Sequence, residues 1–318
     1  MANSIKVAVV QSEPDWYNLQ GSVKKAIKLI IEAAEGGAEL IAFPEVFIPG
    51  YPLFLWNNAA NVDRNSDYIR NSLSYDSPEF QSIIDTIKEY PINVVLGLSE
   101  RYKNSVYIAQ CIIDKTGEIV LKRRKLKPTH VERVMYGDGR PSDTKNVENL
   151  TFNEAGVRAV GGLNCWEHFQ PLLTFNSACQ HEEIHVGSWP VLSDSGPYYS
   201  QQAAGSLVSA SAYALQTQSY YLFACAIATD KILDKIGGNM PEFFSNAPGC
   251  SCIFAPDGGK ITKDTAPDFD GVIFHDLDMD YIANNKHLVD VVGHYSRPDI
   301  ISLNVHDSNQ ELYHNELQ

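Results

Sequence analysis

An apolar stretch that begins at Val157 leads into the sequence Gly161-Gly162-Leu163-Asn164-Cys165-Trp166-Glu167-His168. The apolar stretch predicts a β-strand and the residues after Cys165 can open a helix, so the cysteine is expected at a strand-to-helix turn. Backbone N–H groups and the positive end of a helix stabilise a thiolate there and lower the thiol pKa. A buried structural cysteine is the alternative, because free cysteines are among the most buried residues. The two glycines and the titratable side chains beside the thiol favour a reactive Cys165.

The composition is that of a globular protein with a sizeable core. The chain has 318 residues, of which 44% are hydrophobic. Its 25 basic and 39 acidic side chains give a net charge of 25 − 39 = −14, and no basic run is longer than Lys122-Arg123-Arg124-Lys125. We therefore expect no nucleic-acid partner and no polyanionic substrate.

The N-terminal residues and the cysteines indicate where the protein works. The chain enters a strand pattern without the charged start and apolar core of a secretory signal, and no apolar run reaches membrane-spanning length. Six cysteines in a chain of this length do not form a disulfide scaffold, and Cys250-Ser251-Cys252 has the wrong spacing for a zinc site. These features predict a cytoplasmic protein with no membrane association and no metal site.

Strand and helix patterns alternate along the chain. Helices are expected between Val23 and Gly36, after the N-cap pair Ser77-Pro78, at 171–179 and at 201–216. Strands are expected at residues 5–11, 39–43, 92–98, 105–114, 118–122, 157–163, 183–189, 220–228, 250–256 and 272–277. Because no linker or repeat interrupts the pattern, we expect a single layered α/β domain over residues 1–318. Within it, we expect a surface insertion at 231–247 and a short C-terminal tail at 300–318.

Two further segments place ionisable side chains next to predicted strands. Phe43-Pro44-Glu45 ends a strand, and the prolines that follow are expected to hold Glu45 at the edge of the sheet. The segment 123–133 combines basic residues with Glu132. Each segment by itself is compatible with a solvated loop. Together with Cys165 they offer a thiol, a general base, an ammonium and a second carboxylate, a set that suits addition to an electrophilic carbon bonded to nitrogen.

Four segments resemble the nitrilase superfamily of carbon-nitrogen hydrolases, and specifically its nitrilase branch. They are residues 42–52, 123–133, 161–171 and 293–299, and the resemblance extends from Ile5 to Asp299. It implies a four-layer α-β-β-α sandwich that pairs through helices into a homodimer and can build a spiral homo-oligomer. Since many relatives carry a longer C-terminal tail that supports the spiral, long filaments are not expected here.

The resemblance also implies roles for individual residues. The four catalytic positions are the nucleophile Cys165, the general base Glu45, the stabiliser of the tetrahedral species Lys125, and the second, positioning glutamate Glu132. Lys127 lies two residues from Lys125 and is its rival. Lys125 is preferred because it directly follows Arg123-Arg124, as in the motif of the family. The implied chemistry needs no metal or organic cofactor.

The implied reaction is hydrolysis of a small organic nitrile. The Cys165 thiolate adds to the nitrile carbon, and water converts the thioimidate into a carboxylic acid and ammonia, or into an amide if sulfur leaves early. Trp166 and the Glu167-His168 pair resemble the nitrilase branch and differ from the amidase and carbamoylase branches. The residues expected to line an apolar substrate pocket are Tyr51, Trp56, Trp166, Trp189 and Pro190.

Two alternatives remain open from the sequence. Cyanide hydratases share much of this pattern, including Asn164, so cyanide conversion to formamide or formate is the nearer alternative. A catalytically silent assembly or binding module is the alternative from another class. Against it stands the presence of all four catalytic positions, for which packing gives no reason.

Overall fold

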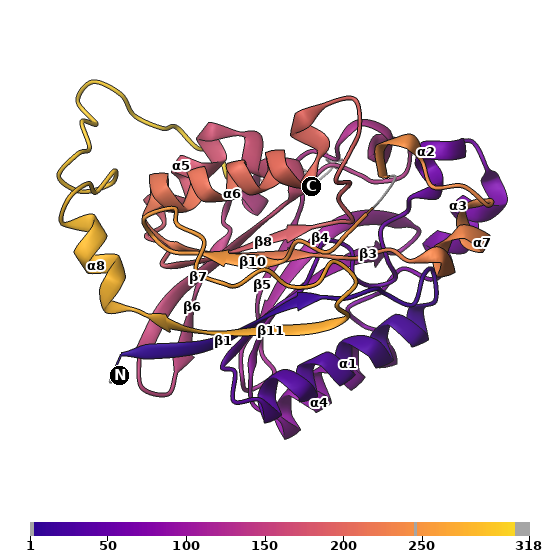
Figure 1. Ribbon diagram of the computed structural model, residues 1–318, viewed down its shortest axis with the longest axis horizontal. Helices are drawn as coiled ribbons and strands as arrows, with labels where there is room; N and C mark the ends of the chain where they lie inside the picture. The colour runs from indigo at the N-terminus through magenta and orange to yellow at the C-terminus, as the bar shows by residue number, and fades with distance from the viewer. Residues whose placement is uncertain (1–2, 245–246, 309–318) are drawn as a thin grey trace, which may run out of the picture.

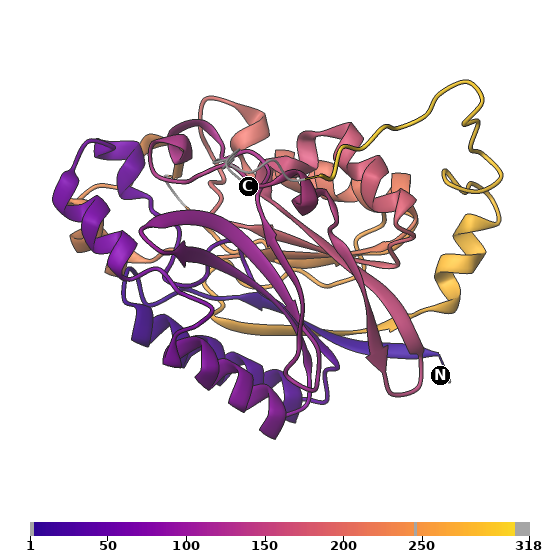
Figure 2. The ribbon, with the colours of Figure 1, turned by 180° about the vertical axis from the view of Figure 1, so that it is seen from behind.

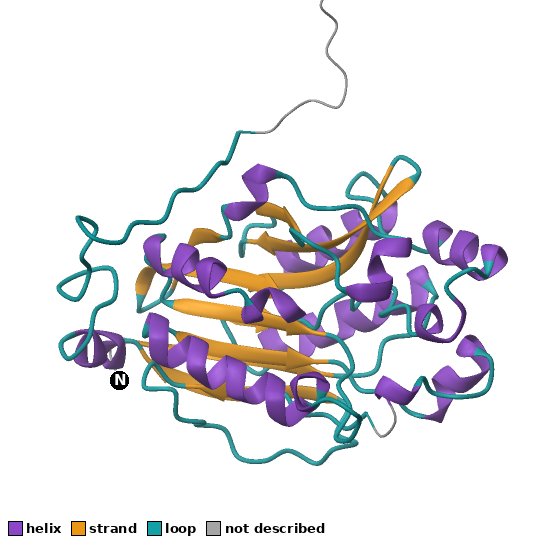
Figure 3. Ribbon diagram, turned by 90° about the horizontal axis from the view of Figure 1, so that it is seen from above, coloured by secondary structure: helices purple, strands orange, loops and turns teal. Residues whose placement is uncertain are grey.

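Two β-sheets stack face to face between two layers of helices in the computed structural model, which describes residues 3–244 and 247–308 (Figures 1 and 3). The first sheet has the strand order β11-β1-β2-β3-β4-β5. β1, β2 and β3 run parallel, and the pairs β1–β11, β3–β4 and β4–β5 are antiparallel. The strands are β1 (Ser4–Gln11), β2 (Leu40–Ala42), β3 (Asn93–Tyr102), β4 (Ser105–Ile113), β5 (Ile119–Arg124) and β11 (Gly271–Asp278).

The second sheet has the order β10-β9-β8-β7-β6. Its strands are β6 (Val147–Phe152), β7 (Gly156–Asn164), β8 (Ile184–Trp189), β9 (Tyr220–Cys225) and β10 (Cys252–Phe254). β7, β8 and β9 are parallel, so their carboxyl ends meet at one edge. Cys165 follows the last residue of β7 and therefore lies at that edge.

Helices cover the outer face of each sheet. α1 (Leu19–Glu35) and α4 (Pro78–Glu89) lie on the first sheet, and α5 (Pro171–Cys179) and α6 (Ala203–Thr217) lie on the second (Figures 1 and 2). As predicted, α4 begins at Ser77, whose hydroxyl accepts a hydrogen bond from the backbone N–H of Phe80. The α-β-β-α sandwich expected from the sequence is confirmed.

Both faces of the central strands are buried, which explains their continuous apolar sequences. In β1, Ile5, Val7 and Val9 join the core between the two sheets, whereas Ala8 and Val10 pack with α1 and α4. β9 divides its side chains in the same way between the inter-sheet core and the layer under α5 and α6. Because successive side chains of a strand point to opposite faces, these strands contribute to three cores. One core lies between the two sheets, and one lies between each sheet and its helices.

Several elements differ from the sequence prediction. β6 was not expected, because Glu148 and Asn149 interrupt its apolar alternation; it is an edge strand that pairs only with β7. The predicted strand 250–256 shortens to the three residues that pair with β9. The helices that the sequence patterns did not indicate are α2 (Phe54–Asn58), α3 (Val62–Arg70), α7 (Leu233–Ile236) and α8 (Asp280–Lys286). Single 3-10 turns occur at Pro141–Thr144, Tyr199–Gln201, Asp230–Ile232 and Glu242–Phe244.

The segment 231–247 is more than the surface insertion we expected. Ile232 and Ile236 are almost fully buried, and Phe244 is only 8% exposed. They share a core with residues of α2, including Phe54 and Leu55. Because the segment is polar on average, its sequence did not indicate these buried apolar side chains. Residues 245 and 246 lie outside the described part.

The C-terminal features are peripheral to the sheets. Residues 300–308 of the expected tail have no helix or strand, and residues 309–318 lie outside the described part. In the late segment 293–299, Tyr295 is 63% exposed and Arg297 pairs with Asp299 on the surface. No helix in residues 3–244 and 247–308 is long and apolar enough to cross a membrane.

Candidate active site

Cys165 forms the turn at the end of β7. Its backbone has φ = 47°, in the left-handed region that is uncommon for residues other than glycine. The 3-10 turn Cys165–Phe169 follows at once, and α5 begins only at Pro171. The predicted strand-to-helix turn is therefore present, but the first helical element is one short turn.

The two glycines before the cysteine make room for other side chains. A Cβ atom on Gly161 would lie 2.0 Å from Oε1 of Glu182, and one on Gly162 would lie 2.3 Å from Oε1 of Gln110. Gly161 therefore leaves space on the helix side of β7, and Gly162 leaves space between the sheets.

Glu45, Lys125 and Glu132 meet in one buried cluster. Nζ of Lys125 lies 2.9 Å from Oε1 of Glu45 and 2.9 Å from Oε2 of Glu132. The lysine and Glu45 side chains are fully buried, and that of Glu132 is 2% exposed. Lys127 instead lies on the surface and pairs with Asp138. The structure thus brings Lys125, and not its rival, between the two carboxylates.

The charges in this cluster act on one another and on the thiol. Burial raises the pKa of Glu45 to about 8, although Lys125 opposes the shift. Burial works to lower the pKa of Lys125, but the charges of Glu132 and Glu45 outweigh it and hold that pKa above its ordinary value. The lysine is therefore an ammonium between two acidic groups.

The thiol of Cys165 behaves differently from the sequence expectation. Burial, followed by the negative charge of Glu45, raises its pKa well above the ordinary value, and the nearby Lys125 opposes this only in part. The lowering of this pKa that we expected from a helix N-terminus is outweighed, because a single 3-10 turn has only a small dipole and the thiol is buried. At rest the side chain of Cys165 is a neutral thiol.

Glu132 is held in place by three donors. Besides Lys125, the backbone N–H of Thr129 donates to its Oε2 at 2.6 Å, and the hydroxyl of Tyr51 donates to its Oε1 at 2.9 Å. Nε1 of Trp56 donates in turn to the Tyr51 hydroxyl at 3.3 Å. Glu45, by contrast, has a buried Oε2 atom without a hydrogen-bond partner among the described residues. That oxygen is available to accept a proton.

A second buried pair, Arg123–Glu167, ties the two halves of the site together. The guanidinium binds both carboxylate oxygens at 2.7 and 2.6 Å. The same carboxylate accepts the backbone N–H of Leu126, next to Lys125, and that of Asn164, next to Cys165. The sequence analysis used Arg123 and Glu167 only as features of the family motifs and did not predict their pairing; the signal was their position within the segments 123–133 and 161–171.

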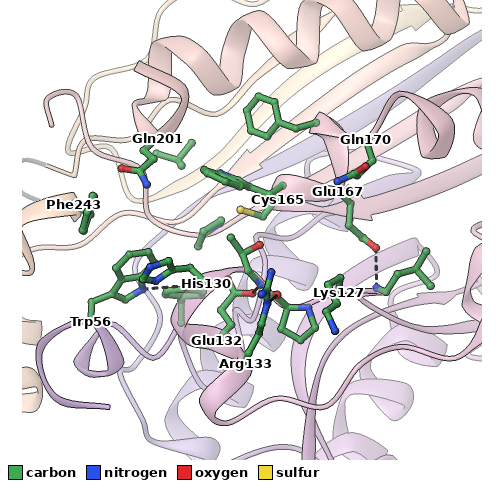
Figure 4. Close-up of a pocket in the computed structure, with 18 of the residues that line it drawn as sticks. Trp56, Lys127, His130, Glu132, Arg133, Cys165, Glu167, Gln170, Gln201 and Phe243 are labelled. Atoms are coloured by element: carbon green, nitrogen blue, oxygen red, sulfur yellow. Dashed lines mark hydrogen bonds between the residues drawn. The ribbon is translucent and has the colours of Figure 1, made fainter. Parts of the chain in front are cut away.

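A cavity of about 580 Å³ opens above Cys165 (Figure 4). In Figure 4 the sulfur of Cys165 points into it, and Trp56, His130 and Phe243 lie on the opposite side. Its apolar lining includes Trp166, Phe169, Leu173, Pro190, Leu192 and Phe244. Glu45 and Lys125 are not part of this lining and, being fully buried, lie beneath it.

Four of the five residues expected to line a pocket do so: Tyr51, Trp56, Trp166 and Pro190. Trp189 does not. It is fully buried, stacks on His168 and Phe223, and donates from Nε1 to the hydroxyl of Tyr221. Strand alternation turns it toward the layer under α6, so it belongs to the core. Phe243 and Phe244, from the segment 231–247, are pocket residues that the sequence did not indicate.

No group of three or more His, Cys, Asp or Glu side chains in the described ranges is arranged to hold a metal ion. The acidic side chains of the site are occupied by Lys125 and Arg123.

Comparisons with known proteins agree with this geometry. The sequence profile described as carbon-nitrogen hydrolase matches residues 6–286, which leaves the segment 293–299 outside the match. A protein named nitrilase from Meyerozyma guilliermondii is 56% identical over 314 residues, covering 98% of this chain and 99% of its own. An arylacetonitrilase from Macrophomina phaseolina is 43% identical, covering 96% of this chain and 92% of its own.

Solved structures share the fold at low sequence identity. The NitFhit protein of C. elegans has a TM-score of 0.73 at 17% identity, over 98% of this chain and 70% of its own. An amidase from Nesterenkonia sp. has a TM-score of 0.65 at 15% identity, over 91% of this chain and 96% of its own. The family profile and the near full-length relatives establish that this chain belongs to the carbon-nitrogen hydrolase family.

Proposed function

We propose that the protein is a nitrilase, which hydrolyses an organic nitrile to a carboxylic acid and ammonia with Cys165 as the nucleophile. The observation that carries this proposal is the buried Lys125 ammonium, held between Glu45 and Glu132, whose charges act on the Cys165 thiol in the wall of an apolar cavity. The names of the reported relatives, nitrilase and arylacetonitrilase, support it.

The first step forms a covalent adduct. Glu45 takes the proton of the Cys165 thiol as sulfur attacks the nitrile carbon, so the thiolate exists only while it reacts. One bond of the triple bond opens onto nitrogen, which receives the thiol proton from Glu45 and becomes the thioimidate nitrogen, so that Glu45 is ionised again. Lys125 lies where it can donate to this nitrogen as negative charge develops. Its two carboxylate partners keep it protonated and fixed in place.

Hydrolysis then takes two water molecules. The first, deprotonated by Glu45, adds to the thioimidate carbon, and the tetrahedral species expels ammonia and leaves a thioester. The second water attacks the thioester carbonyl, and the carbon–sulfur bond breaks to give the acid and the free thiol. If the tetrahedral species expels sulfur instead of ammonia, the product is the amide.

The cavity supports a substrate with an apolar, aromatic body. Its aromatic lining and its volume suit a ring with a short nitrile arm, and cyanide would leave most of it empty. We therefore favour an arylaliphatic nitrile over cyanide. A silent scaffold is disfavoured because it would gain nothing from burying an ammonium and two carboxylates, a costly arrangement.

We also propose a homodimer and a cytoplasmic location. Val208 and Leu215, seven residues apart on one face of α6, are 58% and 54% exposed, which suits a helix that a second copy covers. All six cysteines are free thiols, as expected in a reducing compartment.

The test is ammonia release by the purified protein from phenylacetonitrile, benzonitrile, an aliphatic nitrile and cyanide, with each carbon product identified. We expect acid and ammonia, fastest from phenylacetonitrile, and no turnover by Cys165→Ala at unchanged thermal stability. Formamide from cyanide alone would replace the proposal with cyanide hydration. No turnover of any compound by the wild type would favour the scaffold.

A further inference from the structure

A row of buried polar side chains runs from α6 to the backbone of the nucleophile. The Tyr213 hydroxyl lies 2.6 Å from Oε2 of Glu182, and Oε1 of Glu182 lies 2.7 Å from Nδ1 of His185. Nε2 of His185 lies 2.9 Å from Nε2 of His168, whose Nδ1 lies 2.6 Å from the carbonyl oxygen of Cys165. None of these side chains belongs to the lining of the cavity. We call Glu182, His185 and His168 the histidine chain.

The histidine chain is fully shielded from solvent and fits its space closely. Its three residues are at most 5% exposed. Gly161 is the residue that admits Glu182, since a Cβ atom there would lie 2.0 Å from Oε1. A buried carboxyl beside two imidazoles is costly unless every polar atom is paired, and here each carboxyl oxygen and each ring nitrogen has a partner.

The hydrogen positions follow from the last acceptor. A carbonyl oxygen only accepts, so Nδ1 of His168 carries a hydrogen and donates to Cys165. Burial lowers the pKa of His168 and of His185 well below the ordinary value, so both rings are neutral. His168 must then accept at Nε2 from Nε2 of His185, which leaves Nδ1 of His185 as an acceptor. Burial raises the pKa of Glu182 to about 8, so at neutral pH Glu182 is mainly the acid that donates to it.

The carbonyl at which the histidine chain ends, that of Cys165, belongs to the Cys165–Trp166 peptide group. The same peptide carries the N–H of Trp166. Burial raises the pKa of the Cys165 thiol, and the N–H of Trp166 acts against that rise. A donor on the carbonyl polarises the peptide and strengthens its N–H as a donor. The strained φ of 47° at Cys165 means that this peptide plane must be held by its surroundings.

We propose that Glu182, His185 and His168 are positioning residues for the reaction. As a one-way series of donors they fix and polarise the Cys165–Trp166 peptide, so that its N–H faces the sulfur and the negative charge that develops beside it. This inference rests on the proposed function only in taking Cys165 as the nucleophile.

Packing alone would be a different explanation, and it can be separated. His168 stacks on Trp189 with ring centroids 5.1 Å apart, and His185 lies 4.0 Å from the ring of Tyr213. A phenylalanine at position 168 keeps an aromatic ring and removes the donor. A glutamine at position 182 keeps both the donor to His185 and the acceptor for Tyr213, whereas a leucine keeps neither.

The experiment measures the alkylation rate of Cys165 by iodoacetamide at fixed pH, together with kcat, KM and thermal stability. A Cys179→Ser background removes the exposed thiol. In His168→Phe and Glu182→Leu we expect alkylation and kcat to fall about tenfold to a hundredfold, with KM changed less than about threefold. In Glu182→Gln we expect both rates to stay within about threefold of the parent.

Unchanged alkylation and kcat in a folded His168→Phe variant would overturn the proposal. So would a Glu182→Gln variant that loses as much as Glu182→Leu, because the donor direction would then be wrong. If His168→Phe does not fold, the two Glu182 variants decide. Alkylation needs no nitrile, so the expected alkylation pattern in a protein that turns over no nitrile would overturn the proposed function and leave this inference standing.

Discussion

The ordinary pKa values of a cysteine thiol and a glutamate carboxyl do not suit the roles proposed for Cys165 and Glu45, and burial raises both pKa values. The raised pKa of Cys165 keeps the sulfur protonated at rest, which protects it from oxidation and alkylation. The raised pKa of Glu45, about 8, gives it the basicity to take that proton. The two shifts have one physical cause, the exclusion of water from the floor of the cavity.

Glu45 should therefore control the pH dependence of turnover. The base must be ionised to act, so kcat/KM is expected to rise with pH and to level off above about pH 8. Glu45→Gln should lower kcat by about a hundredfold to ten-thousandfold with little change in KM. A pH profile of kcat/KM that is flat between pH 6 and 9 would rule out this assignment.

Glu182 should affect stability in a pH-dependent way. Its pKa in the folded protein, about 8, lies above the ordinary 4.5, so the folded state holds its proton while the unfolded state releases it. The wild type is therefore penalised increasingly as pH rises from 4.5 to 8, and Glu182→Gln is not. The melting temperature of Glu182→Gln relative to the wild type should increase between pH 5 and 8, and an equal difference at both pH values would contradict a protonated Glu182.

At the scale of elements, the site is assembled by joining the end of β5 to the end of β7. Lys125 follows β5 and Cys165 follows β7, and these strands belong to different sheets. Glu167 connects them, because it accepts backbone N–H groups from both segments while Arg123 neutralises its charge. The stacking of the sheets alone would leave the positions of these two strand ends relative to each other less well defined.

Glu167→Ala should accordingly damage both stability and catalysis. It leaves the buried Arg123 without its partner, which costs about 3–5 kcal/mol, and kcat of the folded protein should fall at least about tenfold because the two strand ends separate. The matched control is Glu100→Ala, which breaks the similarly buried Arg124–Glu100 pair, whose carboxylate accepts no hydrogen bond from the Lys125–Leu126 or Asn164–Cys165 backbone. Urea unfolding and steady-state kinetics should show lost stability in both variants and lost kcat only in Glu167→Ala.

The described part of 231–247 acts as a wall of the cavity. Phe244 contacts Trp56 edge-on at 5.2 Å between ring centroids and lines the cavity, and Ile232 and Ile236 anchor the segment. Phe244→Ala should therefore enlarge the cavity and shift kcat/KM toward bulkier aryl nitriles by about tenfold relative to phenylacetonitrile. The control Phe269→Ala removes a surface aromatic ring outside the cavity, and an equal selectivity change in both variants would contradict the assignment.

At the scale of the whole molecule, no segment among residues 3–244 and 247–308 covers the outer face of α6 at Val208 and Leu215. The inner side of this helix packs on the second sheet, whereas Val208 and Leu215 face outward. The net charge of −14 disfavours nonspecific self-association, so a stable dimer would need such an apolar face.

If α6 forms the dimer interface, charged side chains introduced on its outer face should dissociate the dimer. Val208→Glu combined with Leu215→Glu should convert a dimer of about 71 kDa, twice the chain mass of 35.3 kDa, into a monomer. Val62→Glu, at an exposed apolar residue of α3, is the control. Light scattering coupled to size exclusion gives the masses, and a wild-type monomer or a dimer that survives the double substitution would remove α6 from the interface.

Much of the fold and part of the site could be predicted from local patterns. Alternation within the strands, the Ser77-Pro78 helix start and the segments around Glu45, Lys125 and Cys165 depend on neighbouring residues. The structure contains the predicted helix start and most of the predicted strands, and it places Lys125 against Glu45, whereas the catalytic roles stay predictions. β6, α7 and the pocket residue Phe244 could not be found in this way, because their apolar residues are few and irregularly spaced. The α7 residues and Phe244 are ordered by contacts with segments distant in the sequence, whereas β6 is ordered by pairing with the following strand, β7.

The sequence by itself determined most of the longer strands and helices, the candidate residues for the chemistry and their places near strand ends, since backbone geometry and side-chain type set these locally. Only the tertiary structure decided which of those residues meet. Lys125 and Lys127 are two residues apart, so strand alternation alone would point both side chains to the same face. Because β5 ends at Arg124, the chain leaves the strand here, and Lys125 is buried while Lys127 is exposed. Contacts in the folded chain likewise place Trp189 in the core and link Glu182, through His185 and His168, to the carbonyl of Cys165. Burial, charge interactions and pKa depend on which atoms surround a group in space, and distant segments of the chain supply those atoms.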